Sequence, residues 1–184
     1  MSILAHLSES PGEAGYLPDM VKDMVFVEVS GVSVEEGDVL PLVYLRESAG
    51  MGEGGISVRV GPFEASAILL QLEGITPSRL LTHDLMADLF REGGMSLERA
   101  ELFGPPGEDP RARLVYRRGF SRHAKEVRPS DALALALRLK APICAERSLM
   151  RGPARTLEFH AEDGGHARAV SRDFGPRRHG RSSA

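Results

Sequence analysis

The segment SDALALALRLK at 130–140 constrains the fold more than any other part of this 184-residue chain. Its leucines alternate with alanines, as they would in a strand, yet it holds no β-branched residue and is built from two strong helix formers. A Pro-Ser-Asp start signal opens it, Lys140 lies in the last turn, and Pro142 follows. The pattern predicts a helix that is apolar nearly all round and therefore deeply buried.

Short strands surround this helix in the sequence. Alternating, β-branched segments predict strands at 24–29, 39–46 and 56–60, and further strands are expected at 97–103, 113–117 and 143–146. The loop between the second and third strands contains Gly50-x-Gly52-x-x-Gly55, formally a dinucleotide-binding fingerprint. Because that fingerprint needs a helix directly after it and a strand follows here, we exclude the match.

Two more helices are predicted between the strands. One begins at Pro62, where a proline costs no hydrogen bond, and ends at Gly74. The other spans Thr82–Glu92, with Leu85, Met86, Leu89 and Phe90 at helical spacing. Helices between pairs of strands, without regular βαβ alternation, indicate an α+β fold with a mixed or antiparallel sheet and about three packed helices.

Composition divides the chain into three parts. Residues 1–20 are rich in Ser, Glu, Gly and Pro and predict a flexible leader, 21–151 a single compact domain, and 152–184 a basic, disordered tail. The leader lacks the features of a secretory signal, and no segment has the about 20 apolar residues of a membrane span. A lone cysteine, Cys144, permits no intramolecular disulfide and is expected to be a reduced core residue. We therefore expect a cytoplasmic protein with no membrane partner.

The small net charge of −3 hides a strong asymmetry. Residues 1–110 hold 6 Lys and Arg against 19 Asp and Glu, whereas 111–184 hold 17 against 7. Segregated charge often marks a surface for a charged partner, but the two halves can equally pair with each other in the fold. The stretch RARLVYRRGFSRHAKEVR at 111–128, which includes Tyr116 and Phe120, suits a nucleic-acid backbone and its bases. The alternative is a solvated strand face that balances the acidic half.

Each predicted helix carries an acid in its first turn: Glu64, Asp84 and Asp131. Two of the helices start with a hydroxyl residue, Thr82 or Ser130, and Thr82 is the expected N-cap. Capping and the helix dipole explain these residues without catalysis, since each such interaction contributes about 0.5–2 kcal/mol. If the three carboxylates converge, they instead form a hard oxygen site suited to Mg²⁺ or Mn²⁺.

Neighbouring side chains would complete a site for phosphoryl chemistry. His83 is able to relay protons near neutral pH, and Arg79 and Arg128, each shortly before a helix start, suit bidentate contacts to a phosphate. Other chemistries lack support, because the sequence shows no zinc-spaced Cys/His cluster, no Walker A loop and no Gly-x-Ser-x-Gly elbow.

Three segments together resemble the bifunctional nuclease domain family, which occurs in bacteria and in plant nucleases. They are VGPFEASAILLQLEG (60–74), SRLLTHDLMADLF (78–90) and EVRPSDALALALRLKAPI (126–143). The family usually has Arg-Pro-Leu before Thr-His-Asp, where this chain has Arg79-Leu80-Leu81, and often an Asp where this chain has Glu126. The resemblance covers roughly 22–151 and implies an α+β domain, a homo-oligomer (dimer or higher), and nuclease activity on DNA and RNA.

The resemblance also assigns the polar residues. Its signature falls on Glu64, Arg79, Thr82, His83, Asp84, Arg128, Ser130 and Asp131. The leading hypothesis is a nuclease in which Asp84, Asp131 and Glu64 are catalytic and hold a divalent metal, with His83 as acid or base. Substrate binding is assigned to Arg79, Arg128, Ser130, Thr82, Arg117 and Arg118. The alternative is a non-catalytic oligomeric module that binds nucleic acid or a small ligand, in which the same residues form a hydrogen-bonded network that fixes three helix starts.

Overall fold

A computed structural model describes residues 23–33, 39–48 and 54–150, and the backbone of 152–153, 156–160 and 168–172. In chain order the elements are β1 (Met24–Ser33), β2 (Leu42–Glu47), β3 (Gly54–Arg59), α1 (Pro62–Leu72), α2 (Thr82–Glu92), β4 (Met95–Phe103), β5 (Arg111–Arg118), β6 (Ser121–Val127), α3 (Pro129–Leu139), β7 (Ile143–Glu146), the short 3₁₀ helix η2 (Arg147–Leu149), β8 (Gly152–Pro153), β9 (Thr156–His160) and β10 (Arg168–Arg172).

One mixed sheet organises the described part of the chain. Its strand order is β6-β5-β4-β7-β1-β2-β3-β8, while β9 and β10 form a separate hairpin. β4 and β7 run parallel, and the other neighbours in the large sheet are antiparallel. The sheet with its three helices confirms the predicted α+β class.

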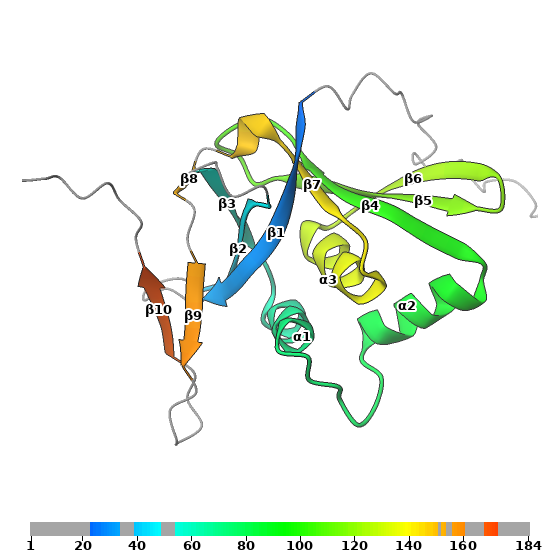
Figure 1. The fold of residues 1–184 in the computed structure, drawn as a ribbon, viewed down its shortest axis with the longest axis horizontal. Coiled ribbons are helices and arrows are strands. Elements are labelled where there is room, and N and C mark those ends of the chain that lie inside the picture. Colours follow the sequence, from blue (N-terminus) through cyan, green and yellow to red (C-terminus); the bar gives the residue numbers. More distant parts are fainter. Residues whose placement is uncertain are drawn as a thin grey trace, which may run out of the picture.

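Helix α3 lies at the centre of the fold, and the strands curve round it (Figure 1). Every residue from Ala132 to Ala136 is fully buried. α3 contacts α1 and α2 on one side and β3, β4 and β5 on the other, so its leucines and alanines meet apolar groups all round. The predicted helix is confirmed, and its small alanines let neighbouring backbones approach closely.

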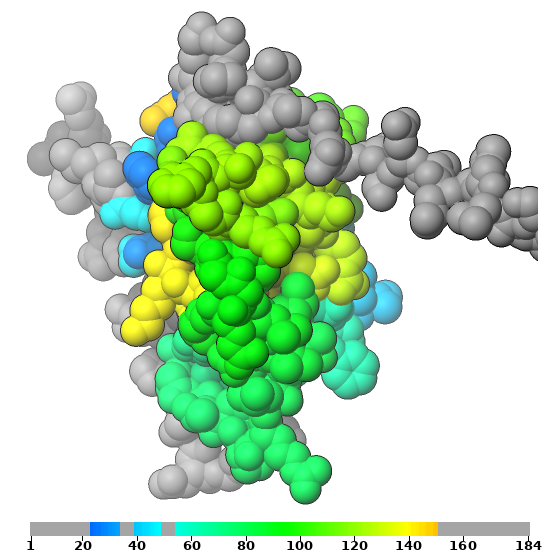
Figure 2. Space-filling model, turned by 90° about the vertical axis from the view of Figure 1, so that its right-hand side faces the viewer, coloured from blue at the N-terminus to red at the C-terminus, as the bar shows by residue number. Residues whose placement is uncertain are grey.

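Helix α2 has the predicted bounds, and most of its apolar residues face outward. His83 and Ala87 are its buried residues, whereas Leu85, Met86 and Leu89 are exposed. Figure 2 shows α2 (green) on the molecular surface below the β5–β6 hairpin. The apolar spacing therefore identified the helix but not its inner face, because the polar contacts of the first turn determine how α2 is rotated against α3.

Two other expectations change at the start of α2 and beyond β5. The N-cap of α2 is Leu81, and Thr82 is an exposed first helical residue, so the prediction of Thr82 as N-cap is wrong. Strand β6 was not predicted, because its sequence SRHAKEV is mostly polar; it pairs with β5 at the end of the sheet, where an edge strand is half solvated.

The ends of the domain are only partly described. The leader 1–20 lies outside the described residues, and the segment predicted as a disordered tail contains β8, β9 and β10. The domain bounds stay a prediction. Cys144 is buried in β7, as expected, and burial raises the pKa of its thiol. None of the described helices has the length and apolar character needed to cross a membrane.

The position of α3 predicts a large stability effect for one leucine. Leu133→Ala removes side-chain volume from a fully buried site and should lower the free energy of unfolding by about 2–5 kcal/mol. Leu40→Ala, the same change at an exposed position, should cost less than about 1 kcal/mol. Urea unfolding followed by circular dichroism measures both, and equal costs would contradict the central placement of α3.

Candidate functional site

The three first-turn acids occupy equivalent positions in their helices. The N-cap residues are Gly61, Leu81 and Arg128, so Glu64, Asp84 and Asp131 are each the third residue of a helix. None of the three N-cap side chains accepts a capping hydrogen bond from the backbone of its helix. The carboxylates therefore lie near the positive ends of three helix dipoles, where negative charge is stabilised.

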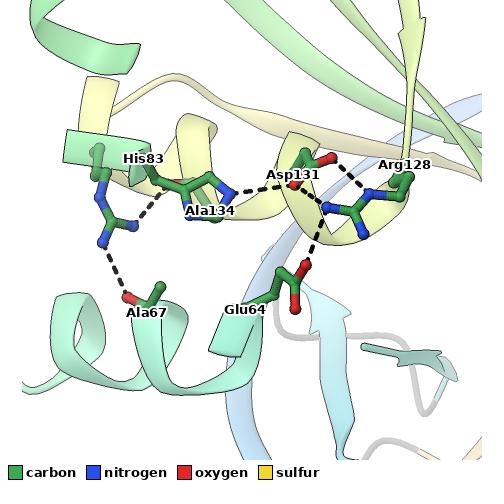
Figure 3. Close-up of polar contacts among 7 residues, drawn as sticks. Glu64, Ala67, His83, Arg128, Asp131 and Ala134 are labelled. Atoms are coloured by element: carbon green, nitrogen blue, oxygen red, sulfur yellow. Dashed lines mark hydrogen bonds and ion pairs between the residues drawn. The ribbon is translucent and has the colours of Figure 1, made fainter. Parts of the chain in front are cut away.

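Arg128 joins two of these acids. Its Nε donates to Asp131 Oδ2 at 2.8 Å, and its Nη2 donates to Asp131 Oδ1 and Glu64 Oε1, both at 3.0 Å (Figure 3). The two N–H groups on Nη1 take part in no hydrogen bond within the described residues, and the side chain is 68% exposed. Arg128 is thus fixed by two carboxylates and still able to bind an anion from solvent.

A glycine makes room for Glu64. A Cβ atom on Gly61 would lie 2.3 Å from Glu64 Oε2, closer than atoms can approach. The carboxylate therefore folds back over the N-cap of α1 while its other oxygen accepts from Arg128. Gly61 is a site residue that the sequence reasoning missed, although its place directly before a helix-starting proline was the available signal.

His83 contacts Asp131 from α2. Its Nε2 lies 3.2 Å from Asp131 Oδ1, and its side chain is 10% exposed. An ionised carboxylate only accepts, so Nε2 carries the hydrogen and Nδ1 of the neutral ring keeps its lone pair. Figure 3 shows His83, Asp131 and Arg128 in a row along α3, with Glu64 opposite on α1. The sequence-predicted convergence is therefore found for these four residues.

Asp84 belongs to a separate network. Its Oδ2 accepts from the backbone N–H of Leu81 at 2.9 Å, and its Oδ1 accepts from Nε of Arg138. Arg138 is buried and also donates to the backbone oxygens of Ala134 (3.1 Å) and Ala67 (3.3 Å). Arg138 thereby links α1, α2 and α3. Sequence reasoning missed it, although an arginine inside an otherwise apolar helix was a signal that it needs an acidic partner.

These networks bear on the predicted metal site. Both oxygens of Asp84 are engaged by α2 and Arg138, and Glu64 and Asp131 share Arg128. Across the described residues, no group of three or more His, Cys, Asp and Glu side chains is arranged to hold a metal ion. As placed here, the three carboxylates do not fit a common metal. A requirement for Mg²⁺ or Mn²⁺ stays a prediction.

The remaining predicted substrate-binding residues lie in different surroundings. Arg79 and Thr82 are exposed before and at the start of α2, and neither side chain has a hydrogen bond within the described chain. Ser130 is buried in the first turn of α3. Their roles in substrate binding stay predictions.

The basic stretch forms the β5–β6 hairpin. Arg117 and Arg122 contact Glu98, Arg111 contacts Glu126, and Arg113 contacts the fully buried Glu101. Glu98 and Glu101 come from the acidic half of the chain, so these pairs support the alternative that the two halves balance each other. Arg118 is exposed at the hairpin and has no such ion pair among the described residues.

The two aromatic residues of this hairpin differ. Tyr116 packs between Phe90 and His123, with ring centroids 5.6 Å and 5.3 Å away, so it is not free to stack on a base. Phe120 lies at the turn and is fully exposed. Only Phe120 retains the geometry that base stacking requires.

The arginines set the charge state of the acids. Burial raises the pKa of Asp131, but hydrogen bonds from Arg128 and His83 outweigh it and hold the pKa below the ordinary value of 3.8. Burial likewise raises the pKa of Asp84, and the Leu81 N–H and Arg138 bring it below that value. The contact with Asp131 raises the pKa of Arg128. Both aspartates are therefore ionised near neutral pH.

These shifts predict how stability depends on pH. Asp84 and Asp131 hold protons more weakly in the folded than in the unfolded state, so unfolding takes up protons in acid. Their stabilisation is complete well above pH 3.8 and is lost as the pH falls below it. Asp131→Asn should flatten the decline of unfolding free energy between about pH 5 and pH 2.5. Asp109→Asn, at an exposed site, should keep the wild-type slope, and equal slopes in all three proteins would refute the assignment.

Comparison with known proteins places this chain in a family. Residues 43–157 match the bifunctional nuclease domain. The chain is also similar to two uncharacterised proteins of Mycobacterium tuberculosis, one from each of two strains; each is 36% identical over 124 residues, which cover 67% of this chain and 73% of the relative. The matched range contains Glu64, His83, Arg128 and Asp131. The chain belongs to the bifunctional nuclease domain family.

Proposed function

We propose that this protein is a nuclease that hydrolyses phosphodiester bonds of DNA and RNA at the junction of α1, α2 and α3. The observation that carries the proposal is the row formed by His83, Asp131 and Arg128. It combines a histidine oriented by a carboxylate with an exposed arginine that is held in place and has two free N–H groups. Family membership supports the same reaction class.

The chemistry follows from these positions. Arg128 binds a non-bridging phosphate oxygen through Nη1 and stabilises charge that develops on the phosphoryl group. Nδ1 of His83 takes a proton from a water molecule as the water oxygen attacks phosphorus. The bond from phosphorus to the leaving ribose or deoxyribose oxygen breaks, and that oxygen takes a proton from solvent. Asp131 holds the imidazole and stabilises its protonated form.

Water as the nucleophile accounts for a broad substrate range. The reaction does not use the 2′-hydroxyl that distinguishes RNA from DNA, so both polymers are expected substrates. We also propose that the protein is cytoplasmic and that it forms a homo-oligomer.

A second candidate function is a non-catalytic module that binds nucleic acid or a small ligand. Two observations favour it. Both carboxylate oxygens of Asp84 and three nitrogens of Arg138 are hydrogen-bonded within the protein, and the side chain of His83 is only 10% exposed. Both suit a structural role. In that case His83 and Asp131 fix helix starts, and Arg128 alone meets the ligand. In that case the wild type hydrolyses no nucleic acid, and substituting Arg128 causes a loss of binding.

A nuclease assay separates the two functions. His83→Gln and Asp131→Asn should each lower the rate of cleavage of single-stranded DNA and RNA at least about 100-fold, because general acid–base catalysis is worth that much or more. Arg128→Lys should also lower the rate, since lysine lacks the planar guanidinium that makes bidentate hydrogen bonds. Each reaction is run with and without EDTA, which tests the metal requirement directly.

Contaminating nucleases are the main confounder, so the control matches the charge change. Asp109→Asn removes an exposed carboxylate that pairs with Arg59 rather than with a residue of the site, and it should retain wild-type activity. All proteins are purified in the same way. Equal activity in wild type, His83→Gln and Asp131→Asn would reject the catalytic assignment.

The exposed side of α2 supports the homo-oligomer. Leu85 and Leu89 are about half exposed and one turn apart, and Met86 lies beside them, which is a larger apolar face than a solvated helix needs. Replacing Leu85 and Leu89 together by Glu should shift the protein to a monomer in analytical ultracentrifugation. Leu40→Glu, at another exposed leucine, should leave the assembly unchanged. A monomeric wild type would remove the oligomer from the proposal.

A further inference from the structure

A pocket of about 210 Å³ lies beside the helix junction, bordered by the end of α1, the loop that follows it and α2. Its volume is below the about 300 Å³ at which pockets for drug-sized molecules begin, so it suits a small ring. Apolar and hydrogen-bonding side chains share its lining: Leu70, Ile75 and Leu80, with Gln71, Thr76 and Arg91. An aromatic ring that carries polar edge groups matches this mixture.

Two large apolar side chains at this pocket are exposed to solvent. Leu80 is 62% exposed and Ile75 is 54% exposed, and both lie in the loop between α1 and α2. Leu80 is also the residue that replaces the proline of the family's usual Arg-Pro-Leu. A base that enters the pocket would cover both side chains and so gain apolar contact.

Arg91 provides a flat, fixed group on the α2 side. Its Nη1 donates to Asp88 Oδ1 at 2.7 Å, and its Nη2 donates to the backbone oxygen of Arg138 at 3.1 Å. Two hydrogen bonds hold the guanidinium plane, while the side chain remains 56% exposed. Unstacked bases bind on such planes in proteins that recognise single strands.

The pocket adjoins the row of His83, Asp131 and Arg128. Asp84 and Arg138 line the pocket, and His83 is the neighbour of Asp84 in α2. Asp131 and Arg138 are seven residues apart in α3, about 10 Å along the helix. Successive bases of a strand are about 3.4 Å apart along a duplex, so a strand with one phosphate at Arg128 reaches the pocket within a few nucleotides.

We propose that this pocket binds one unstacked base of a single-stranded nucleic acid whose phosphate lies at Arg128. The inference rests on the proposed function for its substrate and adds a base subsite to it. The base stacks on the Arg91 guanidinium against Ile75 and Leu80, and its polar edge meets Gln71 and Thr76. A paired duplex keeps its bases stacked, so single strands are the preferred substrate.

The test measures binding rather than cleavage. Fluorescence anisotropy in EDTA compares a labelled single-stranded DNA with an abasic oligomer of the same length. Wild type should bind the base-bearing strand about tenfold more tightly. Thr76→Met, which fills the pocket, and Arg91→Ala, which removes the stacking plane, should each abolish that preference. Their controls are Ser78→Met, in the same loop outside the pocket, and Arg147→Ala, at another exposed arginine; both should keep it.

Each outcome decides the proposal. If wild type binds both oligomers equally, or if Thr76→Met keeps the preference, the pocket is not a base subsite, whatever the nuclease assay gives. If neither oligomer binds, the result rejects both the pocket proposal and nucleic acid as the partner. A base preference that Thr76→Met abolishes sustains the pocket even if no cleavage is seen. Thr76 is exposed, so we expect Thr76→Met to fold. Its result can therefore be interpreted even if Arg91→Ala does not fold.

Discussion

The ion pair between the buried Arg138 and the partly buried Asp84 is the interaction on which the helix junction depends. Arg138 places a charge inside the most buried helix, and its guanidinium is satisfied only because Asp84 and two backbone oxygens meet it there. Removing one partner of such a pair costs about 3–5 kcal/mol, since a buried charge is left alone. The pair therefore sets how α1 and α2 lie against α3, and so where Glu64 and His83 stand.

Two arginines divide the first-turn acids between two roles. Arg138 is buried, with three of its nitrogens hydrogen-bonded, so Asp84 beside it is a positioning residue. Arg128 is exposed and keeps Nη1 free, so Asp131 and Glu64 hold a group that can still bind a ligand. The same helical position thus holds a buried arginine in place from α2 and an exposed arginine from α1 and α3. The role of an acid at this helical position depends on which arginine it contacts.

Much of this arrangement was predictable from sequence, for local reasons. Helix starts follow from proline and first-turn acids, and the buried nature of α3 follows from its leucines and alanines. The convergence of Glu64, His83, Arg128 and Asp131 was predicted as a possibility, but the partner of Asp84 was not, because Arg138 is remote in sequence. The inner face of α2 does not follow from its apolar spacing either, because His83 is buried with its contact to Asp131 while Leu85 and Leu89 are exposed.

Charge at the junction gives a physical reason why substrate binding there needs more than Arg128. With a neutral His83, the sum over Glu64, Asp131 and Arg128 is −1, and an approaching phosphodiester adds another negative charge. The arginines of the β5–β6 hairpin do not relieve this, because Glu98, Glu101 and Glu126 hold most of them. A further positive charge close to the site would therefore strengthen the binding of a phosphate there. Arg79, exposed and without an ion pair in the described chain, is the fixed positive charge nearest in sequence to His83.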